Sequence, residues 1–175
     1  MVNVPTSLVL GGIAIIQHTG VGPLRQRYEP IGGSTTLRLN LGTGIKMTNW
    51  AKSATTASGT GPLDPALDGL DYSGPLELLC VQPRAMIGTG RVFALPPVAQ
   101  RRQDVAPWGW AYALGRWVDT TVDLQGDSAT LGDVPGATAY RVTWLPRMVV
   151  FAQPLSKEFD ENTGLYDWSL SAEEI

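Results

Sequence analysis

The sequence predicts an all-β protein, an antiparallel β-sandwich or barrel with one long ordered loop. Charged residues make up 17% of the chain, below the roughly 25% of an average globular protein, while 20 Gly and 13 Pro exceed average usage. Almost no window keeps a 3.6-residue apolar period free of Gly and Pro, whereas short runs with a two-residue period recur about every 8 to 15 residues. We therefore expect strands joined by turns, in a single β domain over residues 1–175.

The first strands are bounded by glycine. The apolar run Leu8–Ile16 predicts one strand, bent at Gly11-Gly12, where missing side chains permit a bulge. In Thr35–Leu41, three leucines alternate with polar residues, which predicts a half-buried strand. The glycines of Gly42–Gly44 suit a β-turn, so we expect Ile45–Trp50 to be the hairpin partner of that strand.

The later strands follow from alternation or from short apolar runs between turn residues. They are expected at Leu76–Gln82, Arg91–Leu95, Trp108–Leu114, Arg116–Leu124, Ala137–Leu145, Met148–Ala152 and Leu165–Ser171. The last two would pair as a hairpin across the polar segment 160–164. The total is about nine short strands with turn residues between them, which favours an antiparallel sandwich or barrel.

The segment Ser53–Ser73 is rich in Thr, Ser, Gly, Pro and Asp and follows neither period, so we expect a long ordered loop. Loops of this length inside a compact domain are usually functional or supported by a partner. The candidate subunit-contact residues of this loop are Thr55, Thr56, Pro62, Asp64, Pro65, Asp68, Asp71 and Tyr72.

The chain offers few residues for chemistry. It has one His, His18, and one Cys, Cys80, whereas a zinc site needs three or four His, Cys or carboxylate ligands. Cys80 lies in an apolar run, which is typical of an inert core thiol, and His18 is expected in a loop. No glycine pair precedes the Lys-Ser/Thr of a phosphate-binding loop. We expect no catalytic residue, no metal and no cofactor.

Two acidic segments carry oxygen side chains that could act in catalysis or bind calcium. Asp64, Asp68 and Asp71 could supply the acid and base of a glycoside hydrolase, but Asp beside Gly or Pro more often closes a turn, and we favour the turn. The segment Asp160–Gly164 places oxygen side chains as calcium loops do, yet it lacks the Gly at the sixth position and the Glu at the twelfth. It is better interpreted as a hairpin turn.

Charge argues against nucleic acid and membrane partners. The net charge is −3, so no overall attraction to phosphate is expected. The basic pairs Arg25/Arg27 and Arg101/Arg102 are interpreted as solvated loop charges or as intersubunit pairing. The N-terminal residues lack the positive start of a secretory signal, and the first apolar run is too short to span a bilayer.

Six tryptophans could line a carbohydrate platform. Most fall at inward positions of the expected strands, where large aromatic rings fill a core. Trp108 and Trp110, on alternate positions beside Pro107, are the pair expected to be exposed.

A resemblance covers about half the chain. The stretch Thr55–Cys80 resembles a segment of tail structural proteins of tailed bacteriophages, and the parts Arg141–Pro146 and Asp167–Glu174 are similar to the close of the same kind of protein. This implies a β-sandwich subunit that assembles as a ring-forming homo-oligomer in a tail or its distal baseplate. Its partners would be copies of itself and other tail proteins. It would form in the host cytoplasm and reside in the virion, without membrane insertion or nucleic-acid contact beyond passage of the genome.

Three functions therefore stay open. A tail structural subunit, which is not an enzyme, is the one that we expect, and it predicts higher-order oligomers or rings. A carbohydrate-binding module that contacts host surface polysaccharide predicts quenching of tryptophan fluorescence by that polysaccharide. A carboxylate-based hydrolase predicts a glycan-cleaving activity that Asp68→Asn and Asp71→Asn remove.

Overall fold

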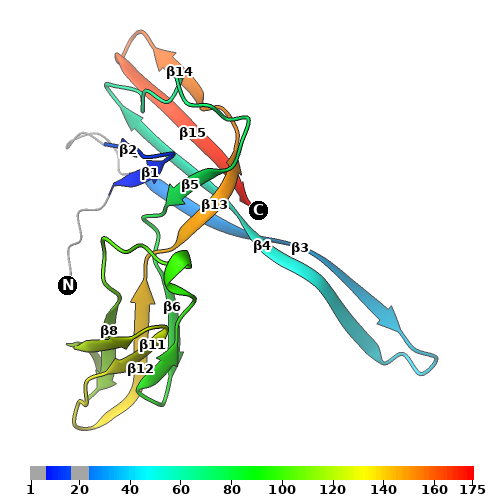
Figure 1. The fold of residues 1–175 in the computed structure, drawn as a ribbon, viewed down its shortest axis with the longest axis vertical. Helices are drawn as coiled ribbons and strands as arrows, with labels where there is room; N and C mark the ends of the chain where they lie inside the picture. The colour runs from blue at the N-terminus through cyan, green and yellow to red at the C-terminus, as the bar shows by residue number, and fades with distance from the viewer. Residues whose placement is uncertain (1–6, 17–23) are drawn as a thin grey trace. The chain divides into compact units, whose positions relative to one another are not determined.

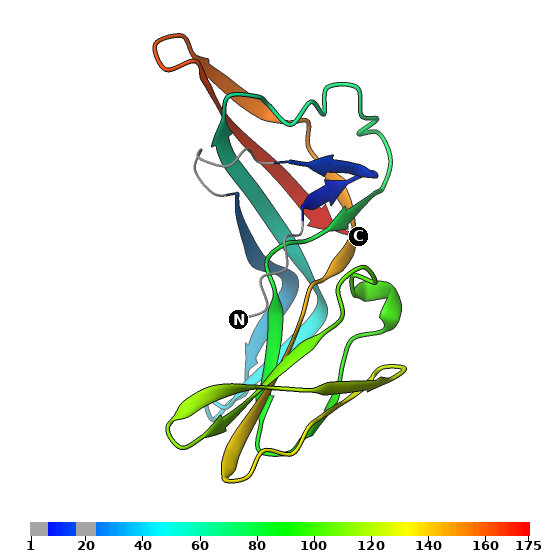
Figure 2. The ribbon, with the colours of Figure 1, turned by 90° about the vertical axis from the view of Figure 1, so that its left-hand side faces the viewer.

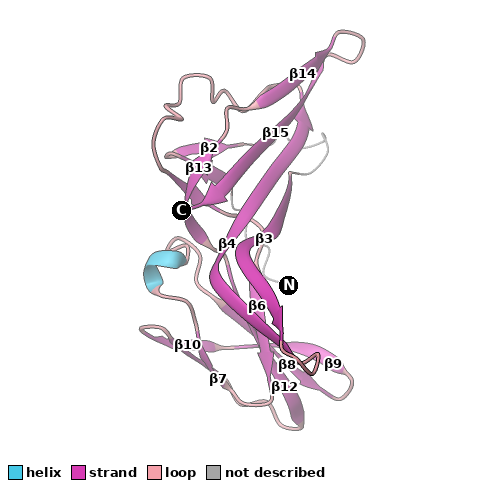
Figure 3. Ribbon diagram, turned by 90° about the vertical axis from the view of Figure 1, so that its right-hand side faces the viewer, coloured by secondary structure: helices cyan, strands magenta, loops and turns pink. Residues whose placement is uncertain are grey.

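The protein is described by a computed structural model over residues 7–16 and 24–175 (Figure 1). Strands make up 62% of the chain, and they form antiparallel sheets of eight, four and three strands. The helical content of this described part is one 3-10 turn, η1 (Val98–Gln100), as Figure 3 shows. The predicted all-β, antiparallel fold class is confirmed. His18 lies outside the described residues.

The described chain divides into two compact units. The first comprises residues 7–14 and 77–148, and the second comprises residues 15–16, 24–76 and 149–175. The chain passes from one unit to the other three times. The expectation that residues 1–175 form a single β domain stays a prediction.

The first unit contains two small sheets over a common core (Figure 2). One sheet has the order β6 (Arg84–Gly88), β12 (Ala137–Trp144), β8 (Trp108–Ala113) and β9 (Arg116–Thr120). The other has the order β10 (Val122–Gln125), β11 (Ser128–Leu131) and β7 (Val92–Ala94). Alternate residues of both sheets point inward, as half-buried strands require, and bury Phe93, Leu95, Ala111, Ala129, Leu131, Tyr140, Val142 and Trp144.

Two further strands, β1 (Leu8–Leu10) and β5 (Leu76–Leu79), belong to this unit except for Leu76, which is the last residue of a segment of the second unit. They pair with each other, and Cys80 follows β5. The predicted core thiol is confirmed, since Cys80 is fully buried with its Sγ 3.6 Å from Sδ of Met148. The prediction of one bent strand over Leu8–Ile16 is wrong. Gly11 and Gly12 have φ of 56° and 83°, the positive values of a two-residue hairpin loop, so the chain reverses into β2 (Ile13–Ile15).

In the second unit the strands run in the order β13 (Arg147–Ala152), β15 (Leu165–Glu174), β4 (Gly44–Gly61) and β3 (Arg25–Arg38). The first two residues of β13 still belong to the first unit. The strand β14 (Ser156–Asp160) pairs with β15 beside this series. The buried side chains of this unit are mostly small or apolar, and they include Ile15, Ala57, Leu67, Val150, Ala152, Trp168, Leu170 and Ala172.

The predicted loop Ser53–Ser73 is shorter than expected, because β4 extends to Gly61. Thr55 and Thr56 are therefore strand residues, and Thr55 is buried between its partners Tyr28 of β3 and Ala172 of β15. A central strand with partners on both sides does not need apolar alternation. The β-branched threonines favour strand structure here. The other candidate contact residues, from Pro62 to Tyr72, do lie in the loop.

The predicted C-terminal hairpin has a different first strand. The polar turn after Asp160 joins β14 to β15, whereas β13 pairs with the far end of β15, where Val150 lies opposite Glu174. All five residues of β14 are exposed, so the strand has no apolar alternation by which the sequence could reveal it. The interpretation of 160–164 as a hairpin turn is confirmed, since Asp160 accepts hydrogen bonds from the Asn162 amide and the Thr163 hydroxyl.

Candidate functional site

The second unit carries a two-stranded arm, which we define as residues Ile31–Lys52. The partners of β15 on β4 run only from Ala54 to Gly61, whereas β3 pairs with β4 as far as Gly44. Beyond the end of β15 the hairpin therefore continues with two strands, and Figure 1 shows it leading away from the other strands of this unit. The predicted hairpin across Gly42–Gly44 is confirmed, with longer strands than expected.

A β-bulge lies in the middle of the arm. Ser34 lies opposite Thr48 but Gly33 lies opposite Trp50, so Asn49 is an extra residue in β4. The Trp50 indole lies across Gly33, where a Cβ atom would come within 2.7 Å of the indole Nε1. Only glycine leaves room for the ring in this position.

The bulge determines which side chains share a face. Residues opposite each other across an antiparallel pair lie on the same face, and Leu37 opposes Ile45 while Thr35 opposes Met47. Without the extra residue, Trp50 would lie on the other face from Met47. With it, Trp50 joins Leu37, Ile45 and Met47 in what we call the apolar face of the arm.

The apolar face is uncovered. Leu37, Ile45, Met47 and Trp50 are between 45% and 51% exposed. The prediction of a half-buried strand over 35–41 is therefore wrong, and Leu41 at the turn is 95% exposed. Alternation placed the leucines of the strand on one face, but no second layer from the described residues of the second unit packs against it.

The opposite face of the arm is polar and cationic. It carries Arg38 and Lys46, and Arg38 donates a hydrogen bond to the Gly42 carbonyl oxygen. With Lys52, which donates to the Ile175 carbonyl oxygen, these are the only charged residues between 31 and 52, so the arm has a net charge of +3. Because the whole chain has a net charge of −3, the remainder carries −6.

An arm of this kind is unfavourable in water by itself. A two-stranded hairpin is marginally stable unless another strand or layer covers it. Between residues 34 and 48 neither outer edge has a partner strand among the described residues, and such edges are templates for pairing with another chain. The exposed edges and the apolar face together indicate a docking surface.

The predicted contact loop is fixed by its own unit. The Lys157 ammonium lies 2.7 Å from Oδ2 of Asp64 and also donates to Asp68. These bonds raise the pKa of Lys157, so the cation persists. The two carboxylates proposed as an acid and base pair thus share one cation, which is typical of a structural contact.

Further along the loop, Asp71 closes a turn. Its Oδ1 accepts a hydrogen bond from the Ser73 amide at 2.9 Å, which confirms the predicted turn role. Hydrogen bonds from the side chain and then from the amide of Ser73 lower the pKa of Asp71. The Tyr72 hydroxyl donates to the carbonyl oxygen of buried Leu67 at 3.2 Å, and burial raises the pKa of Tyr72. The loop is therefore ordered by internal contacts.

The interpretation of Arg101 and Arg102 as solvated or intersubunit charges is wrong, since both are about 95% buried. The guanidinium of Arg102 forms a bidentate pair with Asp104, at 3.0 and 2.6 Å, and donates to the Cys80 carbonyl oxygen. Arg101 lies 3.0 Å from Oδ1 of Asp127. Because Asp127 is distant in sequence, no local pattern could reveal this partner.

An aromatic row lies on the outer face of β8. Trp108, Trp110 and Tyr112 alternate with buried residues, and the two tryptophans, expected to be exposed, are half-buried. Their ring centroids are 6.2 Å apart with planes at 78°, and the Arg141 guanidinium lies 5.7 Å from the Trp110 ring. Tyr112 contacts Trp117 of β9. Sequence reasoning missed the contacts of Arg141 and Trp117 with this row, because these two residues come from the neighbouring strands β12 and β9.

No group of three or more His, Cys, Asp or Glu residues in the described ranges could hold a metal ion. In the same ranges no helix has the length and hydropathy needed to cross a membrane. No protein-family model matches the chain, and no curated protein and no solved structure shows a significant match to it.

Proposed function

We propose that the chain is a structural subunit of a bacteriophage tail, at the distal tail or baseplate, and that it joins its neighbours through the arm. The resemblance of Thr55–Cys80 and of the C-terminal stretches to tail proteins supports the class of protein. The uncovered apolar face of the arm is the observation that carries the assembly role.

The physical reason for an assembly role is the cost of the isolated arm. Leu37, Ile45, Met47 and Trp50 each leave about half of their surface in water, and burial of apolar surface is the main favourable term in association. The +3 charge without any carboxylate also favours an acidic partner surface. The proposal requires no catalytic residue, metal or cofactor.

The experiment uses an arm-shortened variant in which residues 34–49 are replaced by Asn-Gly. This places a two-residue hairpin loop directly on the Gly33–Trp50 pair, so the rest of both strands keeps its register. We expect wild-type protein to form defined oligomers or rings by sedimentation and negative-stain microscopy. The shortened variant should remain monomeric with unchanged thermal unfolding. Equal assembly of both proteins would contradict the role of the arm.

Placement in a tail is tested separately. Gold-labelled antibody raised against the chain should mark the tails of particles of the phage that encodes it. Label confined to heads, or absent from intact and detergent-opened particles alike, would contradict the proposal.

A carbohydrate-binding module is the second candidate, because the aromatic row brings Trp108, Trp110, Tyr112 and Trp117 to one surface with Arg141. The rings of Trp108 and Trp110 lie edge to face, so they present no flat stacking platform. Quenching of tryptophan fluorescence by host polysaccharide that is lost in Trp110→Ala would favour this candidate. The Trp50→Ala variant is the matched control, since Trp50 lies in the arm.

A further inference from the structure

The arm requires a surface that accepts it, and the second unit contains one with complementary properties. Resting on the proposed function, we propose that the arm of one copy docks on the β14–β15 hairpin of a second copy. We call the residues Ser156–Asp167 the acceptor hairpin.

The acceptor hairpin is acidic. It contains Glu158, Asp160, Glu161 and Asp167 and a single cation, Lys157. That cation is already bound by Asp64 and Asp68. The hairpin therefore has four carboxylates with no cation of its own left to pair with them, whereas the arm has three cations and no carboxylate.

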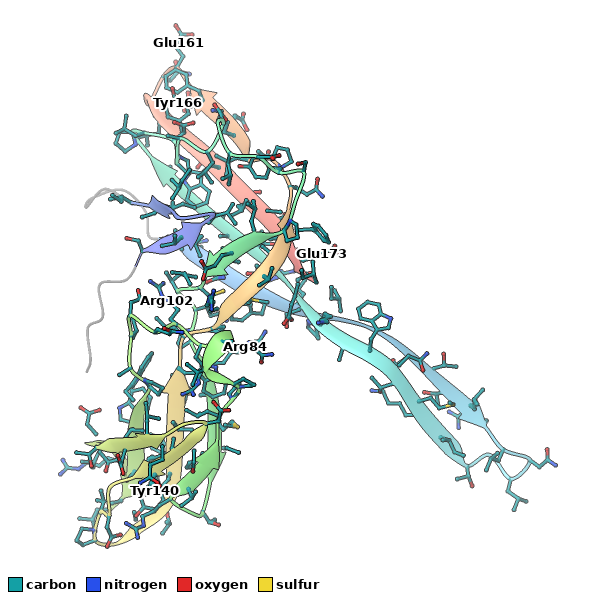
Figure 4. The ribbon with its side chains drawn as sticks, viewed as in Figure 1. Arg84, Arg102, Tyr140, Glu161, Tyr166 and Glu173 are labelled. Carbon is teal, nitrogen blue, oxygen red and sulfur yellow. The ribbon has the colours of Figure 1, made fainter. Side chains whose placement is uncertain are left out.

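The carboxylates also lie close to one another. Glu158 is directly opposite Asp167 across the β14–β15 pair, and like charges in that position destabilise a sheet. Both side chains are exposed, and Figure 4 shows Glu161 at the outer end of this hairpin. A cationic strand that lies beside β14 would relieve this repulsion.

The match involves both faces. On β14, Phe159 lies opposite Tyr166 with ring centroids 4.7 Å apart, and Phe159 is 53% exposed. Glu158 and Asp160 are on the other face of the same strand because side chains alternate. The acceptor hairpin thus has an aromatic face and an acidic face, and the arm has an apolar face and a cationic face.

An arm cannot reach the acceptor hairpin of its own chain. The tip of the arm lies where β4 begins, at Gly44, whereas the acceptor hairpin lies beside the other end of β4, where Gly61 is opposite Tyr166. At about 3.3 Å per residue, the 18 residues of β4 separate them by about 55 Å. A contact between two different patches of identical chains is heterologous, so it closes into a ring or continues as a helix.

The first test reverses the charges of each surface. The arm variant carries Arg38→Glu and Lys46→Glu, the acceptor variant carries Glu158→Lys and Glu161→Lys, and a third protein carries all four changes. We expect self-association to weaken at least about a hundredfold in each double variant. It should return to within about tenfold of wild type in the quadruple variant, whose charges are again complementary. Arg91→Glu with Arg116→Glu, two exposed cations of the first unit, is the matched control and should leave association unchanged.

The quadruple variant decides between acceptors. One refuting result is that the quadruple variant is monomeric like both double variants. Another is that the acceptor variant assembles like wild type. In either case the arm docks elsewhere and the inference is wrong. Wild-type protein that stays monomeric while antibody still marks the tail would also overturn the inference, because the acceptor would then be another protein. That result leaves the proposed function intact, whereas absence of tail labelling would not.

The second test locates the contact directly. An equal mixture of ¹⁴N and ¹⁵N protein is treated with a carbodiimide, which joins an amine to a carboxylate in contact, and is then digested. We expect linked peptides that pair Lys46 with Glu158 or Glu161, with mixed isotopes in about half of them. Linked Lys46 peptides that contain only other carboxylates, or only one isotope, would overturn the proposal.

Discussion

Replacing three residues of the apolar face with serine should prevent assembly without unfolding the protein. The variant carries Leu37→Ser, Ile45→Ser and Met47→Ser, and these side chains are 51%, 45% and 49% exposed. Complete burial of such a side chain contributes about 1.5–3 kcal/mol, so the exposed half contributes about 1 kcal/mol when a partner covers it. Three of them contribute about 3 kcal/mol, which corresponds to a roughly hundredfold weaker association.

The assay is sedimentation equilibrium, combined with thermal unfolding followed by circular dichroism. The unfolding transition should change little, because the three side chains are about half exposed and cross-strand pairs contribute only about 0.2–1 kcal/mol. Ile87→Ser with Val92→Ser, two residues of the first unit that are each 65% exposed, is the control for a general loss of apolar surface. Unchanged association of the arm variant, or an equal loss in the control, would refute the assignment of the arm as the docking surface.

Three further predictions concern the first unit and are measured by chemical denaturation. Leu114 has φ of 51° in the β8–β9 turn and is 90% exposed, so Leu114→Asn should raise the free energy of unfolding by about 0.5–1 kcal/mol, because asparagine tolerates this conformation. Gly109→Ala should lower it by about 1–3 kcal/mol, because the added Cβ would lie 2.8 Å from Cδ2 of Leu131. Asp104→Asn should lower it by about 1–3 kcal/mol at neutral pH, since the buried guanidinium of Arg102 loses its anion. The hydrogen bonds from Arg102 lower the pKa of Asp104 in the folded protein. The stabilisation by this ion pair is therefore complete above the pKa of the unfolded chain, about 3.9, and is lost as the pH falls through the lower pKa of the folded protein.

Each of these changes has a matched control. Leu114→Ala should bring no gain, because alanine avoids positive φ as leucine does. Gly90→Ala should be tolerated, because a Cβ at Gly90 would meet no atom within 4 Å. Asp123→Asn changes an exposed carboxylate of β10 and should leave the acid limb of the stability curve unchanged. An Asp104→Asn protein that retains the acid limb of wild type would disprove the role of this ion pair.

The fold class followed from the sequence because glycine-bounded turns and alternation are local. The core positions of β12 are an example, since Tyr140, Val142 and Trp144 alternate in the sequence and are buried together in the structure. The turn at Gly42–Gly44 and the Asp71 turn are also local, and both were predicted. These features depend only on residues within a few positions of each other.

The candidate site could be predicted only in part. Alternation predicted that Leu37 shares a face with Leu39 and Leu41. It carries no information about whether another layer covers that face. The contribution of Trp50 depends on the bulge at Asn49, and a bulge has no fixed sequence signal. The extension of β4 to Gly61 depends on its partners in β3 and β15, because its own residues from Ser53 onward are mostly small and polar.

The strand β4 has a mechanical consequence for an assembly built as proposed. It connects the arm to the sheet beside the acceptor hairpin, and its hydrogen bonds to β3 and β15 run across the strand direction. Tension between neighbouring copies would therefore load these hydrogen bonds in shear, so that many must break together. In a hairpin that is pulled open from one end, the hydrogen bonds break one after another under a smaller force. A component joined in this way would resist such a force.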